Sequence, residues 1–186
     1  MGLRIIGGDL KGKKLKSIHG TLIRPTADRI REAIFNILSN SIAKALVLDL
    51  YAGTGALGVE ALSRGAKQAL FVDNRNASLF VLKQNIASCG LGEKAGIVKW
   101  NIRQNLNCIK SIGYKFDLIF LDPPYNKNLI TPSLVNLDKS DAVKNNACIV
   151  LEHSVDESLP EGLREFQLAD QRKYGKTLVS FLNYVI

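Results

Sequence analysis

Short apolar runs alternate with amphipathic stretches along most of the chain after residue 45. The runs have the length and composition of buried strands, and we predict five of them at 45–50, 69–72, 96–100, 116–121 and 147–151. Stretches with helical spacing of apolar residues separate them at 57–64, 77–88, 103–112 and 129–139. Repeated strand–helix units predict a mostly parallel sheet that is covered by helices on both faces.

The beginning of the chain has a different pattern. Two short segments around 3–6 and 13–17 are separated by glycines, which predicts a small hairpin within residues 1–23. Apolar residues then recur at helical spacing and predict an amphipathic helix over 26–39. We interpret the hairpin as an extension that precedes the folded core.

Two apolar segments, 164–169 and 177–185, follow the last predicted helix. No helical pattern lies between them and residues 173–176 have turn chemistry, so they predict an antiparallel hairpin that closes the sheet. The sequence therefore predicts a single domain, 1–186, in the α/β class. Its Rossmann-like core over 24–186 is expected to contain a seven-stranded, mostly parallel sheet.

The composition fits one globular core. Of the 186 residues, 46% are apolar, and no apolar stretch approaches the roughly 18 residues of a membrane-spanning helix. Cys89, Cys108 and Cys148 stand far apart without a Cys-x-x-Cys pair, which indicates neither a disulfide framework nor a zinc site, and we predict no metal. The first residues do not form a signal-peptide pattern, so we expect a protein of the reducing cytoplasm without a membrane partner. We also expect a monomer.

Positive charge is concentrated near the beginning of the chain. The 25 basic and 17 acidic residues give a net charge of +8, and residues 1–44 carry +6 of it from nine basic and three acidic side chains. Such a local excess is typical of a surface that binds a polyanion such as nucleic acid. A solvated surface that only keeps the protein in solution is the alternative. The candidate nucleic-acid contacts are Arg4, Lys11, Lys13, Lys14, Lys16, Arg24 and Arg31.

A glycine-rich loop follows the first predicted strand. Residues 49–58 read Asp-Leu-Tyr-Ala-Gly-Thr-Gly-Ala-Leu-Gly and open a helix, so the backbone can turn tightly and approach a ligand closely. The core of this loop is Gly-x-Gly-x-x-Gly, and Asp73 lies twenty residues after Gly53, at the end of the second strand. This pattern also matches a dinucleotide-binding fingerprint, so a dehydrogenase has to be considered.

The charge of Asp49 favours a methyl donor over a dinucleotide. Its carboxylate would oppose a pyrophosphate but attract the ammonium and sulfonium groups of S-adenosylmethionine. Asp73 does not discriminate, because a carboxylate accepts hydrogen bonds from ribose hydroxyls of either ligand. We therefore predict S-adenosylmethionine as the cofactor. The predicted contacts in this loop are Asp49, Tyr51, Ala52, Gly53, Thr54 and Gly55.

The sequence Asp122-Pro123-Pro124-Tyr125 follows the strand at 116–121, at the edge where open α/β sheets place their sites. Methyl transfer to an exocyclic base amine needs acceptors around the amine hydrogens. The Asp122 carboxylate and a backbone carbonyl fixed by proline can supply them. Tyr125 offers a flat face on which a base can stack. We predict Asp122, Pro123, Pro124 and Tyr125 as the catalytic residues.

These two loops resemble those of class I methyltransferases that act on amino groups of nucleic-acid bases. Over nearly its whole length the chain also resembles the RsmD family. The segments that carry this resemblance are Arg4 to Gly8, Arg24 to Thr26, Asp28-Arg29, Arg31 to Ala33, Phe35-Asn36, Glu60 to Ala66 and Tyr174 to Thr177. The resemblance implies methyl transfer from S-adenosylmethionine to guanine N2 of bacterial small-subunit (16S) ribosomal RNA, with that RNA or the small ribosomal subunit as partner.

The resemblance also implies roles by position. The glycine loop would hold the methionine part of the donor, Asp73 its ribose and Asn101 its adenine. Related methyltransferases often carry Asp where Asn101 aligns, but an amide oxygen can still accept a hydrogen bond from the adenine amine.

Two other functions stay open on the sequence. A DNA adenine-N6 methyltransferase is an alternative, because the Asp122 loop recognises an amine rather than one base, although no separate target-recognition domain is evident. A noncatalytic RNA-binding ribosome-assembly factor is another alternative. Retention of Asp122 and of the complete glycine loop argues against it.

Overall fold

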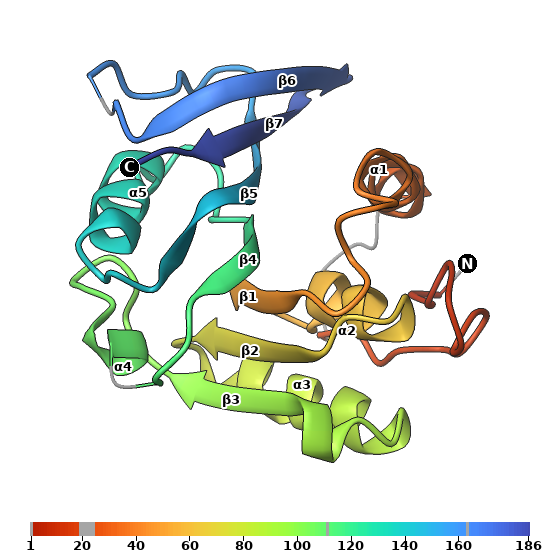
Figure 1. Cartoon of the computed structure of the whole chain (residues 1–186). Coiled ribbons are helices and arrows are strands. Elements are labelled where there is room, and N and C mark those ends of the chain that lie inside the picture. The colour runs from red at the N-terminus through yellow and green to blue at the C-terminus, as the bar shows by residue number, and fades with distance from the viewer. Residues whose placement is uncertain (1, 19–24, 111, 163) are drawn as a thin grey trace.

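The computed structural model describes residues 2–18, 25–110, 112–162 and 164–186. Over these residues the chain forms one seven-stranded sheet in the order β3-β2-β1-β4-β5-β7-β6, flanked by helices (Figure 1). The strands are β1 (Leu46–Leu50), β2 (Gln68–Asp73), β3 (Ala95–Lys99), β4 (Phe116–Leu121), β5 (Val143–Ser154), β6 (Phe166–Tyr174) and β7 (Thr177–Tyr184). The helices are α1 (Pro25–Ile37), α2 (Ala56–Ser63), α3 (Asn76–Ser88), the 3₁₀ turn η1 (Gly92–Lys94), α4 (Asn107–Lys110) and α5 (Ile130–Asp138).

Strands β1 to β5 pair in parallel, whereas β7 is antiparallel to both β5 and β6. The chain proceeds from β1 to β2 and β3 on one side, and then returns to place β4 and β5 on the other side of β1. Sheets with this reversal bind ligands at the carboxyl ends of the strands beside it. The predicted Rossmann-like sheet with an antiparallel C-terminal hairpin is therefore confirmed.

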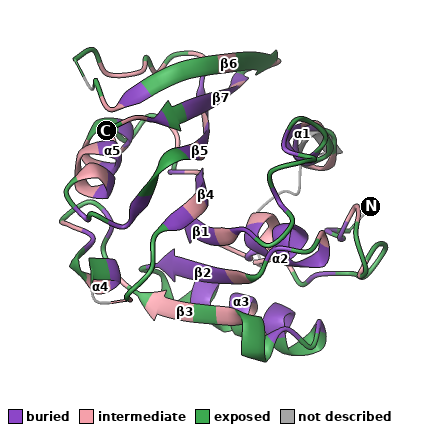
Figure 2. Ribbon diagram, viewed as in Figure 1, coloured by how far each residue is buried: buried purple, intermediate pink, exposed green. Residues whose placement is uncertain are grey.

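Alternate residues of the central strands belong to two separate cores. Val47 packs in the core that includes α1, α2 and α3, whereas Leu48 packs in the core that includes α4 and α5. These two groups of helices lie on opposite sides of the sheet in Figure 1. Burial on both faces explains why these strands read as continuous apolar runs. Figure 2 shows β1 and β2 largely buried and much of the edge strand β6 exposed.

Helix α1 packs on the sheet through part of the predicted apolar stripe and through Phe35, whereas Ile37 of that stripe is exposed. Ile30, Ile34 and Phe35 are buried, and the Phe35 ring lies 5.6 Å, centroid to centroid, from that of Phe120 in β4. The Arg64 guanidinium lies 5.0 Å from the centre of the Phe35 ring, at cation–π distance. The helix thus joins the middle of the sheet to α2. Within the described part of the chain, no helix is long and apolar enough to cross a membrane.

The helix predicted over 103–112 is wrong in its extent, since α4 spans only Asn107–Lys110. Asparagine side chains ahead of it form local turns. The Arg103 N–H donates to Asn101 Oδ1 at 3.2 Å, and the Asn107 N–H donates to Asn105 Oδ1 at 3.0 Å. Such side-chain bonds compete with helical backbone bonds, which accounts for the short helix.

The N-terminal segment forms a hairpin with one antiparallel bridge, between Arg4 and Lys14. The Leu15 N–H donates to the Leu3 carbonyl at 2.8 Å, and both side chains are buried in the core on the α2 side of the sheet. The residues of the predicted extension after 18, together with Arg24, lie outside the described residues.

Candidate active site

A cleft of about 590 Å³ opens at the carboxyl ends of β1, β2 and β4. It gathers nearly all of the predicted cofactor and catalytic residues from distant parts of the sequence. Those that line it are Asp49, Tyr51, Ala52, Gly53, Thr54, Asp73, Asn101, Asp122, Pro123, Pro124 and Tyr125. Lining residues that the sequence analysis did not identify are Ala56, Leu57, Asn74, Arg75, Arg103 and Leu129. Several of these residues directly follow predicted site residues. Their position just after the strand ends could therefore have identified them.

The glycine loop turns through left-handed backbone conformations. Tyr51, Gly53 and Gly55 have φ angles of 60°, 56° and 79°. Gly55 does not line the cleft but precedes α2, and a Cβ there would lie 2.3 Å from Leu82 Cδ1 of α3. Its role as a ligand contact stays a prediction, while the structure gives it a packing role. Glycine is needed here for both its conformation and the close approach of α2 to α3.

Asp49 brings a buried carboxyl group to the floor of the cleft. Its Oδ2 accepts a 2.9 Å hydrogen bond from the Gly58 N–H in the first turn of α2. Burial raises the pKa of Asp49 to about 8, and the nearby charge of Asp73 adds to the increase. A buried carboxylate without a cationic partner is unfavourable, so this position is suited to a positively charged ligand.

Asp73 fixes the rim of the cleft at the end of β2. Its Oδ2 accepts the Gly53 N–H at 2.9 Å and its Oδ1 accepts the Arg75 N–H at 2.8 Å. The side chain therefore joins the glycine loop to the start of α3. A carboxylate has about four lone-pair sites, so both oxygens retain capacity for further donors such as hydroxyl groups.

Asn101 and Tyr51 line the same cleft and follow β3 and β1 respectively. Asn101 Oδ1 accepts the Arg103 N–H, which holds the side chain beside the cleft. The Tyr51 hydroxyl is 2.8 Å from Ser133 Oγ in α5, a hydrogen bond that fixes the ring. The Tyr51 ring is thereby tied to α5, and Asn101 is held by a local turn.

The loop after β4 presents Asp122 to the cleft. Pro123 is buried and Pro124 is exposed, so the two prolines fix the backbone between the core and the surface. Burial, together with the charges of Glu152 and Asp49, raises the pKa of the Asp122 carboxyl group. Among the described residues, none donates a hydrogen bond to this carboxylate, which leaves it available to a ligand.

Tyr125 is held by a residue that the sequence analysis missed. Its hydroxyl donates to Glu152 Oε1 at 2.6 Å and lies 3.3 Å from Thr177 Oγ1. Burial and the charge of Glu152 raise the pKa of the Tyr125 hydroxyl. The only signal for Glu152 was its place after the apolar run of β5, which parallels the place of Asp122 after β4.

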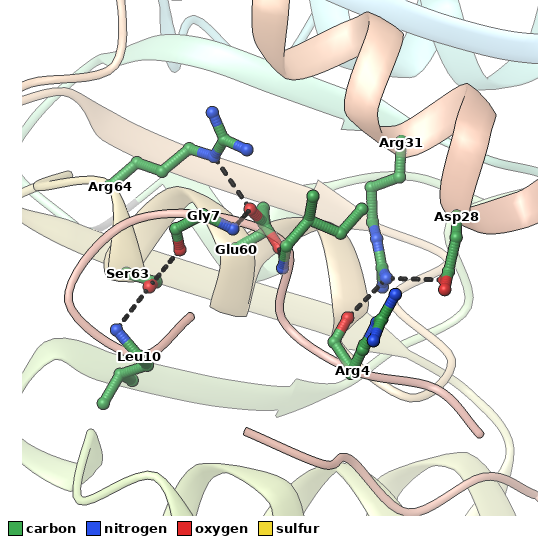
Figure 3. Close-up of polar contacts among 9 residues, drawn as sticks. Arg4, Gly7, Leu10, Asp28, Arg31, Glu60, Ser63 and Arg64 are labelled. Atoms are coloured by element: carbon green, nitrogen blue, oxygen red, sulfur yellow. Dashed lines mark hydrogen bonds and ion pairs between the residues drawn. The ribbon is translucent and has the colours of Figure 1, made fainter. Parts of the chain in front are cut away.

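The predicted nucleic-acid contacts fall into three groups. Exposed side chains belong to Arg4, Lys11, Lys13, Lys14 and Lys16. Arg24 lies outside the described residues. The structure corrects the prediction for Arg31, because this residue is only 5% exposed. Its guanidinium donates to the Arg4 carbonyl and to Asp28 Oδ1 (Figure 3). It ties the segment to α1 instead of facing solvent, and desolvation lowers its pKa.

A buried carboxylate anchors the same segment to α2. Glu60 accepts hydrogen bonds of 2.7 Å from both the Ile6 and Gly7 N–H groups, and its Oε1 lies 2.8 Å from Arg64 Nε (Figure 3). Ser63 adds a second link, since its hydroxyl donates to the Gly7 carbonyl at 2.7 Å. The exposed lysines therefore stand on a segment that is fixed to the core.

The sheet order and the cleft at its carboxyl edge define a class I methyltransferase fold. Solved structures share it. That of the Escherichia coli protein YhhF has a TM-score of 0.86 and 33% identity, covering 98% of this chain and 97% of that chain. That of a Thermus thermophilus protein, TTHA0928, has a TM-score of 0.80 and 30% identity, covering 98% and 99%.

The chain belongs to the RsmD family, since the family model described as Conserved hypothetical protein 95 matches residues 3–183. The ribosomal RNA small subunit methyltransferase D of Escherichia coli K12 is 35% identical over 158 residues, which cover 85% of this chain and 78% of that protein. YlbH of Bacillus subtilis strain 168 is 34% identical over 178 residues, which cover 96% of this chain and 97% of YlbH.

Proposed function

We propose that the chain transfers a methyl group from S-adenosylmethionine to the N2 amine of a guanine in small-subunit ribosomal RNA. Relatives from Escherichia coli and Haemophilus influenzae that are named ribosomal RNA small subunit methyltransferase D support the class of reaction and the RNA. The structural observation that carries the proposal is the place of Asp122. Its carboxylate accepts no hydrogen bond from a described residue and lines the same cleft as Asp49 and the glycine loop.

The cleft fits the cofactor in size and in chemistry. Its volume of about 590 Å³ lies within the range of about 300 to 1,000 Å³ of small-molecule sites. Asp49 offers a buried negative charge to the ammonium and sulfonium groups, Asp73 offers acceptors to the ribose hydroxyls, and Asn101 offers an amide to the adenine. When bound, S-adenosylmethionine supplies the electrophilic methyl group.

Asp122 orients and activates the acceptor amine in this proposal. Its carboxylate accepts one amine hydrogen and the Pro123 carbonyl accepts the other, which directs the nitrogen lone pair toward the methyl group. The nitrogen becomes positively charged as it is methylated. The Asp122 carboxylate stabilises that charge and takes the proton, directly or through water. Tyr125 keeps the base in place by stacking.

Nucleoside analysis tests the proposal. The purified protein is incubated with methyl-labelled donor and small-subunit ribosomal RNA, both naked and in assembled subunits, and the RNA is digested. We expect the label in N2-methylguanosine. Asp122→Ala should slow single-turnover transfer by about 10²- to 10³-fold while donor affinity stays within about twofold. Label in N6-methyladenosine, or a wild-type rate in Asp122→Ala, would contradict the proposal.

A further inference from the structure

Glu152 and Asp122 occupy equivalent places on neighbouring parallel strands. Leu121 of β4 pairs with Leu151 of β5, so Asp122 and Glu152 come next on strands that are about 4.8 Å apart. The charge of Glu152 also raises the pKa of Asp122, an effect that requires the two carboxyl groups to be close. The carboxyl edge of the sheet therefore carries two neighbouring acceptors.

The Glu152 carboxylate is only partly satisfied by the protein. Its Oε1 accepts the Tyr125 hydroxyl at 2.6 Å, while no described residue donates to its Oε2. The side chain is half-buried, so burial raises its pKa and the Tyr125 hydrogen bond opposes the increase. A half-buried carboxylate with a free oxygen favours a hydrogen-bond donor as its ligand.

The bases with exocyclic amines differ in the atom beside the amine on the Watson–Crick edge. Guanine has the N1–H donor next to its N2 amine. Adenine has the N1 acceptor next to its N6 amine, and cytosine has the N3 acceptor next to its N4 amine. Two neighbouring carboxylates are therefore complementary to guanine alone, because with either other base one carboxylate would face a lone pair.

We propose that Glu152 determines base specificity by accepting the N1–H of the target guanine while Asp122 accepts a hydrogen of its N2 amine. This inference rests on the proposed function. In this arrangement Tyr125 has two roles, since its ring stacks on the base and its hydroxyl holds Glu152 in position. The pair of carboxylates excludes adenine at the step of base recognition.

Two analogues of the target guanosine test this proposal. Once nucleoside mapping has located the methylated guanosine, that residue is replaced by 2-aminopurine, which keeps the 2-amino group but lacks both N1–H and O6. Wild-type protein should methylate the guanine RNA about 10- to 100-fold more efficiently, in kcat/KM, than the 2-aminopurine RNA. A 6-thioguanosine RNA, which keeps N1–H and replaces O6, should behave like guanine.

Variants then assign the discrimination to Glu152. In Glu152→Gln and Glu152→Ala the ratio between guanine and 2-aminopurine should fall toward one, mainly through slower guanine methylation. Calorimetric binding of S-adenosylmethionine within about twofold of wild type shows that the cleft is intact. Glu93→Gln, a charge-removing change of an exposed residue in η1, is the matched control and should keep the wild-type ratio.

Several results would overturn the proposal. Equal wild-type rates on guanine and 2-aminopurine would show that N1–H is not read, whether or not the variants fold. Equal rejection of 6-thioguanosine would assign the discrimination to O6, and an unchanged ratio in both Glu152 variants would assign it to another residue. Failure of the proposed function is distinct, because the wild type would then form no N2-methylguanosine on unmodified RNA.

Discussion

Asn85 in α3 donates a 2.9 Å hydrogen bond to the Thr54 carbonyl in the glycine loop. The same amide accepts the Lys16 N–H at 2.7 Å and donates to the Lys16 carbonyl at 3.0 Å. One buried side chain therefore joins the basic segment to the loop that lines the cleft. The proposed RNA-binding and donor-binding parts of the molecule share this connection.

Asn85→Ala should lower the free energy of unfolding by about 1 to 3 kcal/mol, because Asn85 is fully buried and the change removes its hydrogen bonds to the backbone of Lys16 and Thr54. Urea denaturation followed by circular dichroism measures this difference. Lys83→Ala, on an exposed position of the same helix, should change the unfolding free energy by less than about 0.5 kcal/mol. Equal effects of the two changes would refute the role of Asn85.

Glu60→Gln should release the N-terminal segment from α2. The charge of Glu60 is fully buried, and the amide that replaces it cannot accept from both the Ile6 and Gly7 N–H groups while pairing with Arg64. We expect a loss of about 3 kcal/mol in unfolding free energy and faster tryptic cleavage within residues 2–18. Glu93→Gln serves as the exposed control, and resistance to trypsin equal to that of wild type would count against the anchor.

The affinity for S-adenosylmethionine should rise with pH between about 6 and 7.5. The pKa of Asp49 is about 8 without ligand, so below that pH the group holds a proton that a cationic ligand must displace. The dissociation constant should fall by up to about tenfold per pH unit over this range. Asp49→Asn should bind more weakly and lose most of this dependence in calorimetry. Asp141→Asn, which removes an exposed carboxylate, should retain it.

Without donor, the same carboxyl group should weaken the fold as the pH rises. The folded state keeps the Asp49 proton up to about pH 8, whereas the unfolded chain releases it near 3.8. The free energy of unfolding therefore falls progressively as the pH rises across that window. At pH 8 we expect Asp49→Asn to increase the free energy of unfolding by about 1 kcal/mol or more, because Asn keeps an acceptor for the Gly58 N–H. Thermal unfolding of the wild type and of Asp49→Asn at pH 5 and pH 8 measures this difference. An absent or reversed difference at pH 8 would contradict the prediction.

Neutralising the exposed lysines of the segment should weaken RNA binding and reduce its salt dependence. Replacing Lys11, Lys13 and Lys14 together by Gln should lower the slope of log affinity against log salt by about 2 to 3. Filter binding at several salt concentrations measures the slope. The matched control replaces three exposed lysines elsewhere, Lys94, Lys110 and Lys139. A slope that changes equally in both sets would assign the effect to net charge alone.

The parallel part of the sheet could be predicted because its strands are buried on both faces, as in the run from Phe116 to Leu121. The polar parts of the strands could not be predicted in this way. β5 begins at Val143, before the exposed Lys144, and β6 continues through the mostly exposed residues 170–174 by pairing with β7. Hydrophobic periodicity carries no signal where an edge strand faces solvent on both sides.

The candidate site also contains residues that could be predicted from the sequence and residues that could not. Asp49 and Asp122 stand in recognisable loops directly after apolar runs, so their convergence followed from the parallel sheet. Glu152 has no motif around it, and its proximity to Tyr125 depends on strand register. The burial of Arg31 depends on a carbonyl of the N-terminal segment. A count of charges along the sequence gives no information about such a tertiary partner.

The anchors of the N-terminal segment are also far from it along the chain. Ile6 bonds to a residue 54 positions later, and Lys16 bonds to one 69 positions later. During synthesis the segment leaves the ribosome before α2 and α3, so it has no docking surface until they have followed it. Its lysines therefore reach their final arrangement only after α3 supplies Asn85, which also bonds to the glycine loop, so a chain that ends before α3 lacks the contact that joins the two.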